Sequence, residues 1–579
     1  MKARALLAVA AFLWPALAWS PALAQTGIVG LTASETIVTF GDPVTVSGAI
    51  DGGGDCAALR AVTLQWRPAD STGFATVAQG TSAADGTFAF EQSQPHTGRF
   101  RATLAQQGPC PAAVSDEVLV RVRVRVDTSL VVGSPEAGDC VDVSVIVSPA
   151  KPGQTVELQH RQGGWQTRET LVLGPGGAGI ARPCLGWDDV GVLRLRLWWE
   201  AQDALNETAA GPVLAFEVTE AAWMEAIDEV VGGRAVSVSV GEDGTFLYRH
   251  ADQAPRVPAS NEKLLLAMAV LDVFGPDARI RTRSAAVAID DGVVDGDLWI
   301  LGRGDPRVGP STMRALARRI ADAGVARVAG RVMGSTTYFR RDWDAPGWNG
   351  DARRYVNRPT ALTFEGNRSP SPEREAAEVL TQRLERLGVA VAGEPGAGAP
   401  PDGLTDVAVV RSKPIDGLLT RMLRPSDNFA AEVLGKWLGA EVRGAPGTIS
   451  KAAATIRDWA ANLGAEFTLH DSSGLSYDNR VTAAGIVRLL WQAEASDWGA
   501  DLRRALPTGG QGTLRDRLAK VRLRAKTGTL TGVSTLSGWI YAVGPGSWVE
   551  FSILSAGMSK STAAAIEDRI VRIVRSGVR

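Results

Sequence analysis

The chain has 579 residues and a mass of 61.0 kDa, several times the ~100 to 150 residues of a typical domain, so roughly two to four hydrophobic cores are expected. Hydrophobic residues make up 45% and charged residues 21%, which excludes a disordered, collagen-like or many-span membrane chain. The 61 Lys and Arg nearly balance the 63 Asp and Glu, so no global field would hold a nucleic acid or an anionic bilayer.

The first 24 residues have the pattern of a secretory signal peptide. Lys2 and Arg4 precede an apolar stretch at 5–19, and Ala22-Leu23-Ala24 places small residues where a signal peptidase reads the chain. The alternative is an uncleaved anchor, but Pro15 interrupts a run that is already shorter than the ~20 apolar residues of a membrane span. We expect cleavage after Ala24, secretion, and no transmembrane anchor afterwards.

Four cysteines, Cys56, Cys110, Cys140 and Cys184, lie in the first third of the chain. None belongs to a C-x-x-C pair of the kind that zinc or redox sites use, so disulfides are expected in an oxidising compartment. Four cysteines allow three connectivities. Pairing Cys56 with Cys110 and Cys140 with Cys184 is favoured because it keeps one bridge inside each of two modules. The alternative is four buried free thiols.

Residues 26 to about 218 contain a weak internal repeat of short alternating segments. The sequence VTLQWR at 62–67 is echoed by VELQHR at 156–161, and GRFRATL at 98–104 is echoed by GVLRLRL at 191–197. Alternation with period two predicts half-buried strands. We predict two all-β modules, at 25–124 and 125–218, that resemble immunoglobulin-like or fibronectin-like sandwiches. Trp66 is expected to be a core residue.

From about residue 219, segments of helical period alternate with strands, which indicates an α+β region. A helix is predicted at 375–387 with Ala376, Leu380, Leu384 and Leu387 on one face. Further helices are predicted at 314–323 and 561–574, strands at 235–240, 522–526, 534–543 and 548–555, and a flexible connection at 393–403.

Several common enzyme signatures are absent from the sequence. There is no H-E-x-x-H, no G-x-S-x-G and no P-loop, and only four histidines occur. A zinc peptidase, a Ser-His-Asp hydrolase and a P-loop enzyme are therefore disfavoured, and neither metal nor other cofactor is expected. A nucleophilic enzyme with this sequence would use a lysine as base, because desolvation lowers the pKa of a lysine toward neutrality.

Ser260 and Lys263 lie one helical turn apart at the start of a predicted buried helix at 264–273. At this spacing the Ser260 Oγ can reach the Lys263 Nζ, and the helix N-terminus favours developing negative charge. The alternative for Ser260 is a helix N-cap, since S-x-x-K occurs by chance in long chains. Glu262 is expected to be solvated or paired rather than catalytic.

Two later segments carry the same kind of signal. Ser426 and Asn428 can point the same way from an extended turn before a predicted helix at 429–438. Lys526-Thr527-Gly528-Thr529 ends a predicted strand, where it offers a cation, a hydroxyl and a glycine that lets a substrate backbone lie close. The alternatives are a helix cap for the first segment and a solvated strand end for the second.

In this order, S-x-x-K, S-D-N and K-T-G resemble the motifs of the penicillin-binding proteins and serine β-lactamases. The DSSGLS segment at 471–476 is similar to D-G-S-G-L-S, and 166 residues separate Ser260 from Ser426. These features narrow the resemblance to the D-alanyl-D-alanine carboxypeptidases of the S13 peptidase type, the class C low-molecular-mass penicillin-binding proteins. It covers roughly 220 to 579, and the LGRGDPR segment at 301–307 departs from the family's G-G-D-P-T-like segment.

The resemblance implies a multidomain chain in which residues 219–579 form an α+β penicillin-binding-protein/serine β-lactamase-like catalytic domain with a large insertion at about 280–412. It implies a serine-type D-Ala-D-Ala carboxypeptidase, with DD-endopeptidase activity as a further option. Peptidoglycan stem peptides are the expected substrates and β-lactams the covalent inhibitors. The expected location is the periplasm or the surface of a bacterium.

The resemblance also implies a role for each residue of the three motifs. It makes Ser260 the acylated nucleophile and Lys263 its base. Ser426 would relay protons to the leaving amine, and Asn428 would bind the amide of the acyl donor. Lys526 and Thr527 would hold the substrate carboxylate beside Gly528, and the Thr529 N–H would complete the oxyanion hole.

Two rival functions remain open. A serine β-lactamase shares the acylation step, but the E-x-x-x-N segment of class A enzymes is absent between S-D-N and K-T-G. Position 426 is Ser, so the Y-x-N form of another class is also unsupported. We therefore expect a penicillin adduct to persist. The second rival is a catalytically idle protein that binds the cell wall through its β modules.

Overall fold

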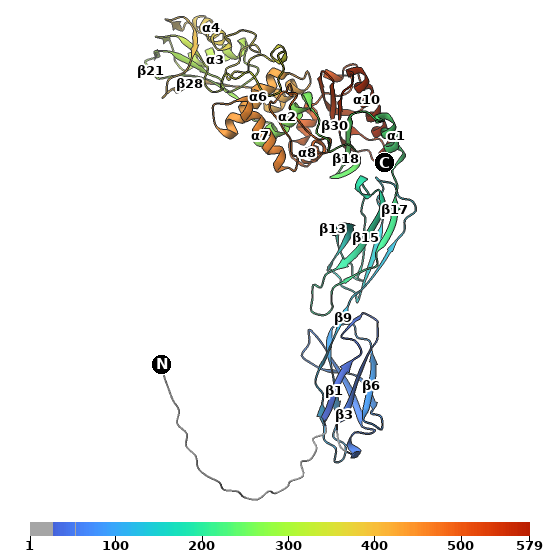
Figure 1. The fold of residues 1–579 in the computed structure, drawn as a ribbon. Helices are drawn as coiled ribbons and strands as arrows, with labels where there is room; N and C mark the ends of the chain where they lie inside the picture. Colours follow the sequence, from blue (N-terminus) through green and yellow to red (C-terminus); the bar gives the residue numbers. More distant parts are fainter. Residues whose placement is uncertain (1–26, 52–53, 579) are drawn as a thin grey trace, which may run out of the picture. The chain divides into compact units, whose positions relative to one another are not determined.

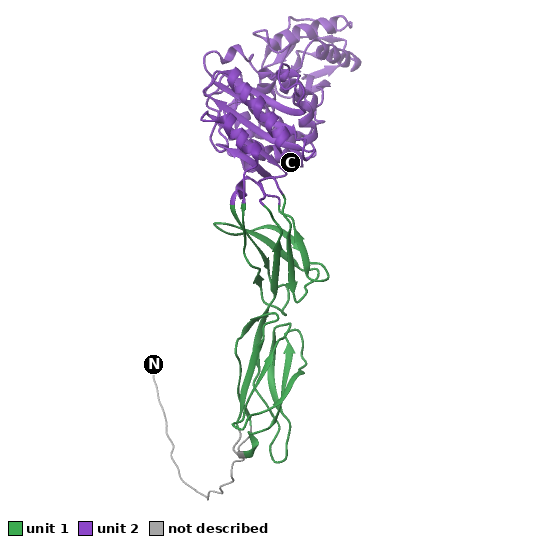
Figure 2. Ribbon diagram, turned by 90° about the vertical axis from the view of Figure 1, so that its right-hand side faces the viewer, with its two compact units in different colours: residues 1–133, 140–183, 192–217 green, residues 134–139, 184–191, 218–579 purple. Residues whose placement is uncertain are grey.

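The computed structural model describes residues 27–51 and 54–578, so the predicted signal peptide at 1–24 lies outside the described residues. The chain divides into two compact units, shown in different colours in Figure 2. Residues 1–133, 140–183 and 192–217 belong to the first, here called the β unit, and residues 134–139, 184–191 and 218–579 to the second, the α/β unit. Within the described ranges, no helix has the length and apolar character of a membrane span.

The first half of the β unit consists of two sheets around a shared core. The strands are β1 (Gly27–Ala33), β2 (Ile37–Thr39), β3 (Val44–Asp51), β4 (Ala61–Pro68), β5 (Ala75–Thr81), β6 (Thr87–Gln92), β7 (Gly98–Leu104), β8 (Ala113–Val114) and β9 (Val118–Arg123). One sheet has the order β1-β3-β6 and the other β2-β9-β7-β4-β5, with β8 beside β7. Val46, Leu64 and Phe100 are buried in the core, and Trp66 packs against it as predicted.

The second half of the β unit repeats this arrangement. Its strands are β10 (Arg125–Leu130), β11 (Val143–Ser148), β12 (Thr155–Gln162), β13 (Gly164–Val172), β14 (Ala178–Ala181), β15 (Gly191–Trp199), β16 (Ala209–Ala210) and β17 (Leu214–Val218). The sheets have the orders β10-β11-β14 and β13-β12-β15-β16. The antiparallel pair β4 and β7 corresponds to the antiparallel pair β12 and β15, which explains the sequence repeat.

The predicted Cys56–Cys110 disulfide is present in the first half of the β unit. Cys140 and Cys184 are disulfide-bonded as well. None of the four described cysteines is a free thiol, so the alternative of buried thiols is wrong.

A five-stranded antiparallel sheet forms the centre of the α/β unit. Its order is β19 (Thr245–His250), β18 (Val236–Glu242), β31 (Trp548–Ala556), β30 (Val533–Tyr541) and β29 (Leu523–Leu530). Helices α1 (Ala222–Val231) and α10 (Lys560–Gly577) pack on one face with Ile553, and the neighbouring Leu554 joins the core on the opposite face. Figure 1 shows α10 beside β30. The alternation of side chains along β31 thus fills two cores.

The second core is helical. It contains α2 (Glu262–Phe274), α5 (Ile415–Leu423), α6 (Asn428–Arg443), α7 (Ile449–Asn462), α8 (Ala483–Ala495) and α9 (Gly499–Ala505). All residues of α2 from Glu262 to Leu271 are buried, which confirms the predicted buried helix. Because α2 is surrounded on every side, its two charged residues at the N-terminus are buried along with the apolar ones.

Residues 281–411 have a separate core around Leu316 and Leu380. They form α3 (Pro310–Asp322) and α4 (Pro372–Glu385) and two sheets. One sheet has the order β27 (Gly396–Gly398), β25 (Val332–Ser335), β23 (Leu298–Leu301), β20 (Arg281–Ala286) and β28 (Thr405–Arg411), and the other β21 (Ala288–Asp290), β22 (Val293–Asp295), β24 (Arg327–Val328) and β26 (Ala390–Val391).

Two sequence predictions for this region are wrong in part. Leu387 lies beyond α4 and is 47% exposed, because the helix ends two residues earlier, before Gly388 with its φ of 86°. The segment at 393–403 is not only a connection, since β27 inside it pairs with β25 at Met333. The small side chains of this segment suit a short strand packed close to a neighbour.

Candidate active site

A cavity of about 470 Å³ opens in the α/β unit beside β29, and its wall contains residues of all three sequence motifs. This volume is in the usual range for small-molecule sites. The lining residues are Ser260, Ser426, Gly512, Thr513, Arg515, Asp516, Arg517, Thr527, Thr529 and Lys560.

Ser260 lies in a short 3₁₀ turn, η3 (Ala259–Asn261), immediately before α2. Ala259 has a φ of 45°, a conformation that non-glycine residues rarely adopt. Two glycines clamp this turn: a Cβ on Gly474 would lie 1.8 Å from the Ala259 carbonyl oxygen, and one on Gly528 would lie 3.0 Å from the Ser260 nitrogen. The N-cap of α2 is Asn261, so the alternative of Ser260 as the helix N-cap is wrong.

Lys263 is fully buried and reaches three acceptors. Its Nζ lies 3.0 Å from the Ser260 Oγ, 2.7 Å from the Asn428 Oδ1 and 2.5 Å from the Ser473 carbonyl oxygen. Burial lowers the pKa of Lys263 to about 8, against the opposing pull of Asp471 and other acidic groups. A neutral Lys263 can donate to Asn428 and Ser473 and still accept the Ser260 proton. The Ser260 hydroxyl thus lies against the Lys263 side chain, which the S-x-x-K spacing predicts to be within its reach.

Ser426 and Lys526 form a second polar pair at the cavity wall. The Lys526 Nζ donates to the Ser426 Oγ at 2.9 Å. Burial and then the charge of Lys263 hold the pKa of Lys526 well below its ordinary value. Ser426 has a φ of 63°, while Asp427 caps α6 by accepting from the Ala430 N–H. The S-D-N segment therefore both caps a helix and edges the cavity.

The K-T-G segment lies inside β29 rather than at its end, because the strand continues to Leu530 and pairs with β30 throughout. The solvated-end alternative is wrong, since Lys526 is fully buried. The Thr527 hydroxyl donates to Thr513 at 2.7 Å. A Cβ on Gly528 would lie 2.8 Å from the Pro258 carbonyl oxygen, so this glycine admits η3 against the strand.

The sequence did not reveal the layer of acidic groups behind Lys263. Glu262, Glu432 and Asp471 are all fully buried. Of the two expectations for Glu262, solvated or paired, the second is confirmed: the Asn479 side chain donates to its buried carboxyl group. The position of Glu432, one helical turn after Asn428 in α6, was the available signal for its inward direction.

The segment before α4 also reaches the site from a distant part of the chain. The Tyr355 carbonyl oxygen accepts from the Asn428 Nδ2 at 3.0 Å. The Trp348 Nε1 donates to the Asp471 Oδ2 at 2.8 Å. Asn428 is thus fixed at both ends of its amide, by Lys263 and by Tyr355.

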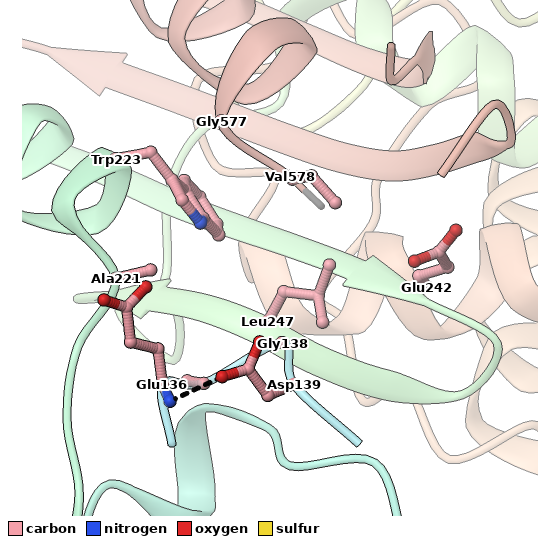
Figure 3. A pocket seen from close by; sticks show the side chains of 10 residues that line it. Glu136, Gly138, Asp139, Ala221, Trp223, Glu242, Leu247, Gly577 and Val578 are labelled. Carbon is pink, nitrogen blue, oxygen red and sulfur yellow. Dashed lines mark hydrogen bonds between the residues drawn. The ribbon is translucent and has the colours of Figure 1, made fainter. Parts of the chain in front are cut away.

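A second hollow of the α/β unit lies near the C-terminal end of α10 (Figure 3). Glu136, Asp139 and Glu242 supply carboxylates to its wall, and the Glu136 N–H donates to Asp139. Its volume of about 30 Å³ is the space of one or two waters. A peptide substrate does not fit in a hollow of this size.

The family comparison agrees with this geometry. Residues 217–371 and 362–576 match the D-Ala-D-Ala carboxypeptidase 3 (S13) family. The chain belongs to this family. A D-alanyl-D-alanine carboxypeptidase of Actinomadura sp. (strain R39) is 28% identical over 59% of this chain and 80% of the relative. A carboxypeptidase of Mycobacterium tuberculosis is 34% identical over 57% of this chain and 78% of the relative.

Among solved structures, penicillin-binding protein 4 of Haemophilus influenzae superposes with a TM-score of 0.54. The two sequences are 18% identical, and the match covers 61% of this chain and 99% of that chain. The likeness confirms the penicillin-binding-protein fold of the α/β unit. The family match begins at residue 217 and leaves the β unit aside.

Proposed function

We propose that Ser260 is the nucleophile of this serine-type D-Ala-D-Ala carboxypeptidase, which cleaves the D-Ala-D-Ala bond of peptidoglycan stem peptides and is acylated by β-lactams. The observation that carries the proposal is the 3.0 Å contact between the Ser260 Oγ and the buried Lys263 Nζ at the wall of the 470 Å³ cavity. A buried lysine with a lowered pKa can serve as the base that a serine nucleophile requires.

In the first step, neutral Lys263 takes the Ser260 proton while the Oγ forms a bond to the scissile carbonyl carbon. Ser260 and Thr529 both line the cavity, and their backbone N–H groups are the proposed donors to the resulting oxyanion. The C–N bond then breaks as a proton reaches the nitrogen of the leaving D-alanine. Water hydrolyses the ester and returns the hydroxyl to Ser260.

Ser426 is the proposed carrier of the proton to the leaving nitrogen. It accepts a hydrogen bond from Lys526, so its own proton is free to point into the cavity. Because Lys526 is fully buried, we propose that it acts through its hydrogen bond to Ser426 and through the electrostatic potential at the cavity wall. Thr527 and the outer wall of the cavity are then left to hold the substrate carboxylate.

Asn428 is proposed to position Lys263 as well as to bind the substrate amide. Its Oδ1 accepts from Lys263 and its Nδ2 donates to Tyr355. If the substrate amide binds to the Asn428 Nδ2, it must replace the Tyr355 carbonyl oxygen as the acceptor. The asymmetric arrangement keeps the Lys263 Nζ directed at Ser260 in the absence of substrate.

We further propose that residues 25–124 and 125–218 are two immunoglobulin-like modules that precede the catalytic domain at 219–579. The paired strands of the two halves and the separate core of residues 281–411, within the insertion predicted at 280–412, support these boundaries. The disulfides support an oxidising location, in the periplasm or at the cell surface.

Labelled benzylpenicillin tests the central assignment. We expect one label per chain on the peptide that contains Ser260, located by mass spectrometry, and D-alanine release from a peptide ending in D-Ala-D-Ala. The S260A variant is the control and should lose both. A label on another serine, or D-alanine release by S260A, would contradict the proposal. Rapid multiple turnover of the penicillin would indicate a β-lactamase, and failure of both assays an idle wall-binding protein.

A further inference from the structure

Three carboxyl groups from three segments meet behind the proposed base. Glu262 is the first residue of α2, Glu432 lies in α6, and Asp471 lies in the segment that follows α7. All three are fully buried. Groups of this kind almost never enter a protein interior without partners, because burial strongly disfavours the charged form.

Asp471 has the surroundings of an ionised carboxylate. Its Oδ2 accepts from the Leu475 and Ser476 N–H groups at 2.9 and 3.0 Å. The Trp348 indole donates to the same oxygen. Its Oδ1 accepts from the Gly474 N–H and the Asn479 side chain at 3.1 and 2.8 Å. The Ser473 hydroxyl donates to the Oδ2 as well, at 3.3 Å, and six donors favour the charged form.

Within the described part of the chain, only one of the two carboxyl oxygens of Glu432 has hydrogen-bond partners. Its Oε1 accepts from the Ser472 and Ser473 N–H groups at 3.0 and 2.8 Å. Its Oε2 has no hydrogen-bond partner among the described residues. Burial and the charge of Asp471 raise the pKa of Glu432 to about 7.

Glu262 is the least satisfied of the three. The Asn479 Nδ2 donates both to its Oε2 and to the Asp471 Oδ1, so the two carboxyl groups meet at one donor, and burial and then their interaction raise the pKa of Glu262. Its Oε1 has no partner within the described part of the chain. Two carboxyl groups in contact cannot both be ionised cheaply, so one must hold a proton. Asp471 has the donors and Glu262 lacks them, which places the proton on Glu262.

The charges around this cluster set the conditions for the base. Lys263 faces Glu262, Glu432 and Asp471 together with Asp427, and Lys526 is the neighbouring cation. A further cation, Lys436 of α6, is paired with Asp342 at 2.7 Å. If all three buried carboxyl groups were ionised, their combined attraction would hold the proton of Lys263.

We propose that Glu262 is a positioning residue that remains a neutral carboxylic acid, donates its proton to Asp471, and so limits the negative charge that faces Lys263. The inference rests on the proposed role of Lys263 as base. The hydrogen bond also anchors the 471–476 segment, whose Ser473 carbonyl receives Lys263 and whose Gly474 packs against Ala259. In support, burial and then the charges of Asp471 and Glu432 raise the pKa of Glu262 well above its ordinary value.

The resting full-length protein offers a direct test by infrared spectroscopy. At neutral pH a buried neutral carboxylic acid gives a carbonyl stretching band that ionised carboxylates lack. Burial also raises the pKa of Glu550 to about 8, so the band of Glu262 is identified as the difference between the wild type and E262Q. We expect the Glu262 band in the wild type, its loss in E262Q, and its retention in the matched control E378Q, which changes a partly exposed glutamate of α4. Absence of the band from the wild type, or its loss in E432Q but not in E262Q, would overturn the proposal.

The pH profile of penicillin acylation separates a neutral Glu262 from an ionised one. A glutamine can donate to Asp471 and accept from Asn479 as the neutral acid does, so E262Q should keep the acid limb within about 0.3 pH unit. E262A should acylate at least ~10-fold more slowly, and E262Q should recover most of that loss. If Glu262 were ionised, E262Q would shift the acid limb downward by about one unit or more.

The infrared band and the acylation assay test different claims, so either can fail without the other. The infrared band needs neither substrate nor an active serine, so it can be recorded in S260A. If acylation at Ser260 fails while the band behaves as expected, the catalytic assignment is wrong and the protonation of Glu262 stands. If acylation succeeds and the band is missing, only the inference about Glu262 is overturned.

Discussion

The two units bury charge to different degrees: in the β unit Lys151 is 5% exposed and paired with Asp203, whereas several charged side chains of the α/β unit are fully buried. In the β unit, the Arg182–Asp142 ion pair joins side chains that are 71% and 50% exposed, where such a pair contributes little. In the α/β unit, Lys263, Lys526 and Glu262 are fully buried. Burying a charged side chain lowers the stability of a protein unless the charge is well paired. Fully buried charges therefore suggest a role other than stability. Of these residues, Lys263 contacts Ser260 and Lys526 contacts Ser426 at the proposed active site.

Positive φ values at non-glycine residues occur in both units, for example at Leu59 of the β unit. Ala259 and Ser426 both have positive φ values although neither is glycine, and both lie in or beside a proposed catalytic motif. Each such residue costs on the order of 1–3 kcal/mol and persists only where the surroundings enforce it. The β unit combines alternating strands with the Cys56–Cys110 disulfide. Its stability and the chemistry of the α/β unit should therefore respond to different mutations.

The largest effect is expected from the proposed nucleophile and base. S260A should abolish acylation by benzylpenicillin, and K263A should slow it by several orders of magnitude, because the base that faces the hydroxyl is removed. Stopped-flow measurement of acylation under excess penicillin checks both, with circular dichroism to confirm folding. Near-full acylation by K263A would contradict the assignment.

Two glycine variants test whether the close packing of Gly474 against Ala259 holds η3, the turn that carries Ser260, in place. Gly474 and Gly464 have φ values of 78° and 77°, but a Cβ would lie 1.8 Å from the Ala259 oxygen at the first and meet nothing within 4 Å at the second. G474A should slow acylation by roughly 100-fold, as expected for displacement of a catalytic group by about 1 Å. G464A carries the same backbone strain and is the matched control. Equal acylation rates in the two variants would exclude the clamp.

The pH profile measures the burial of the base. With a pKa of about 8, Lys263 is protonated below this pH and cannot accept the Ser260 proton. The acylation rate should therefore fall about tenfold per unit as pH drops below 8 and level off above it. Single-turnover rates between pH 5 and 10 check this expectation. A profile that is flat from pH 5 to 7 would show that a group other than Lys263 sets the rate.

The smallest effect on catalysis is expected from the β unit. Replacing Cys56 and Cys110 by serine opens a bridge that joins residues 54 positions apart. The chain-entropy model predicts a loss of about 4 kcal/mol in the stability of this region. Penicillin acylation should remain within about twofold, since the change lies outside the α/β unit. Denaturant unfolding and the acylation assay together check the pair, and a large loss of acylation would show that the units are coupled.

The sequence determined the features that depend on local pattern. The alternation at 62–67 and 156–161 yielded β4 and β12, and the apolar run after Lys263 yielded the buried helix α2. The repeat also led to the Cys56–Cys110 pairing. The order of the three motifs indicated the family, because each motif places chemically distinctive residues at short fixed spacings. Patterns of this kind are complete within a few consecutive residues.

Only the tertiary structure decided how distant segments complete the site. Asn479 joins Glu262 to Asp471, and the Tyr355 carbonyl fixes Asn428 from a part of the chain more than 70 residues away. The protonation of a buried carboxyl group depends on which donors surround it in space. No local pattern contains that information, because desolvation and Coulomb interaction act through distance and burial and not through sequence separation.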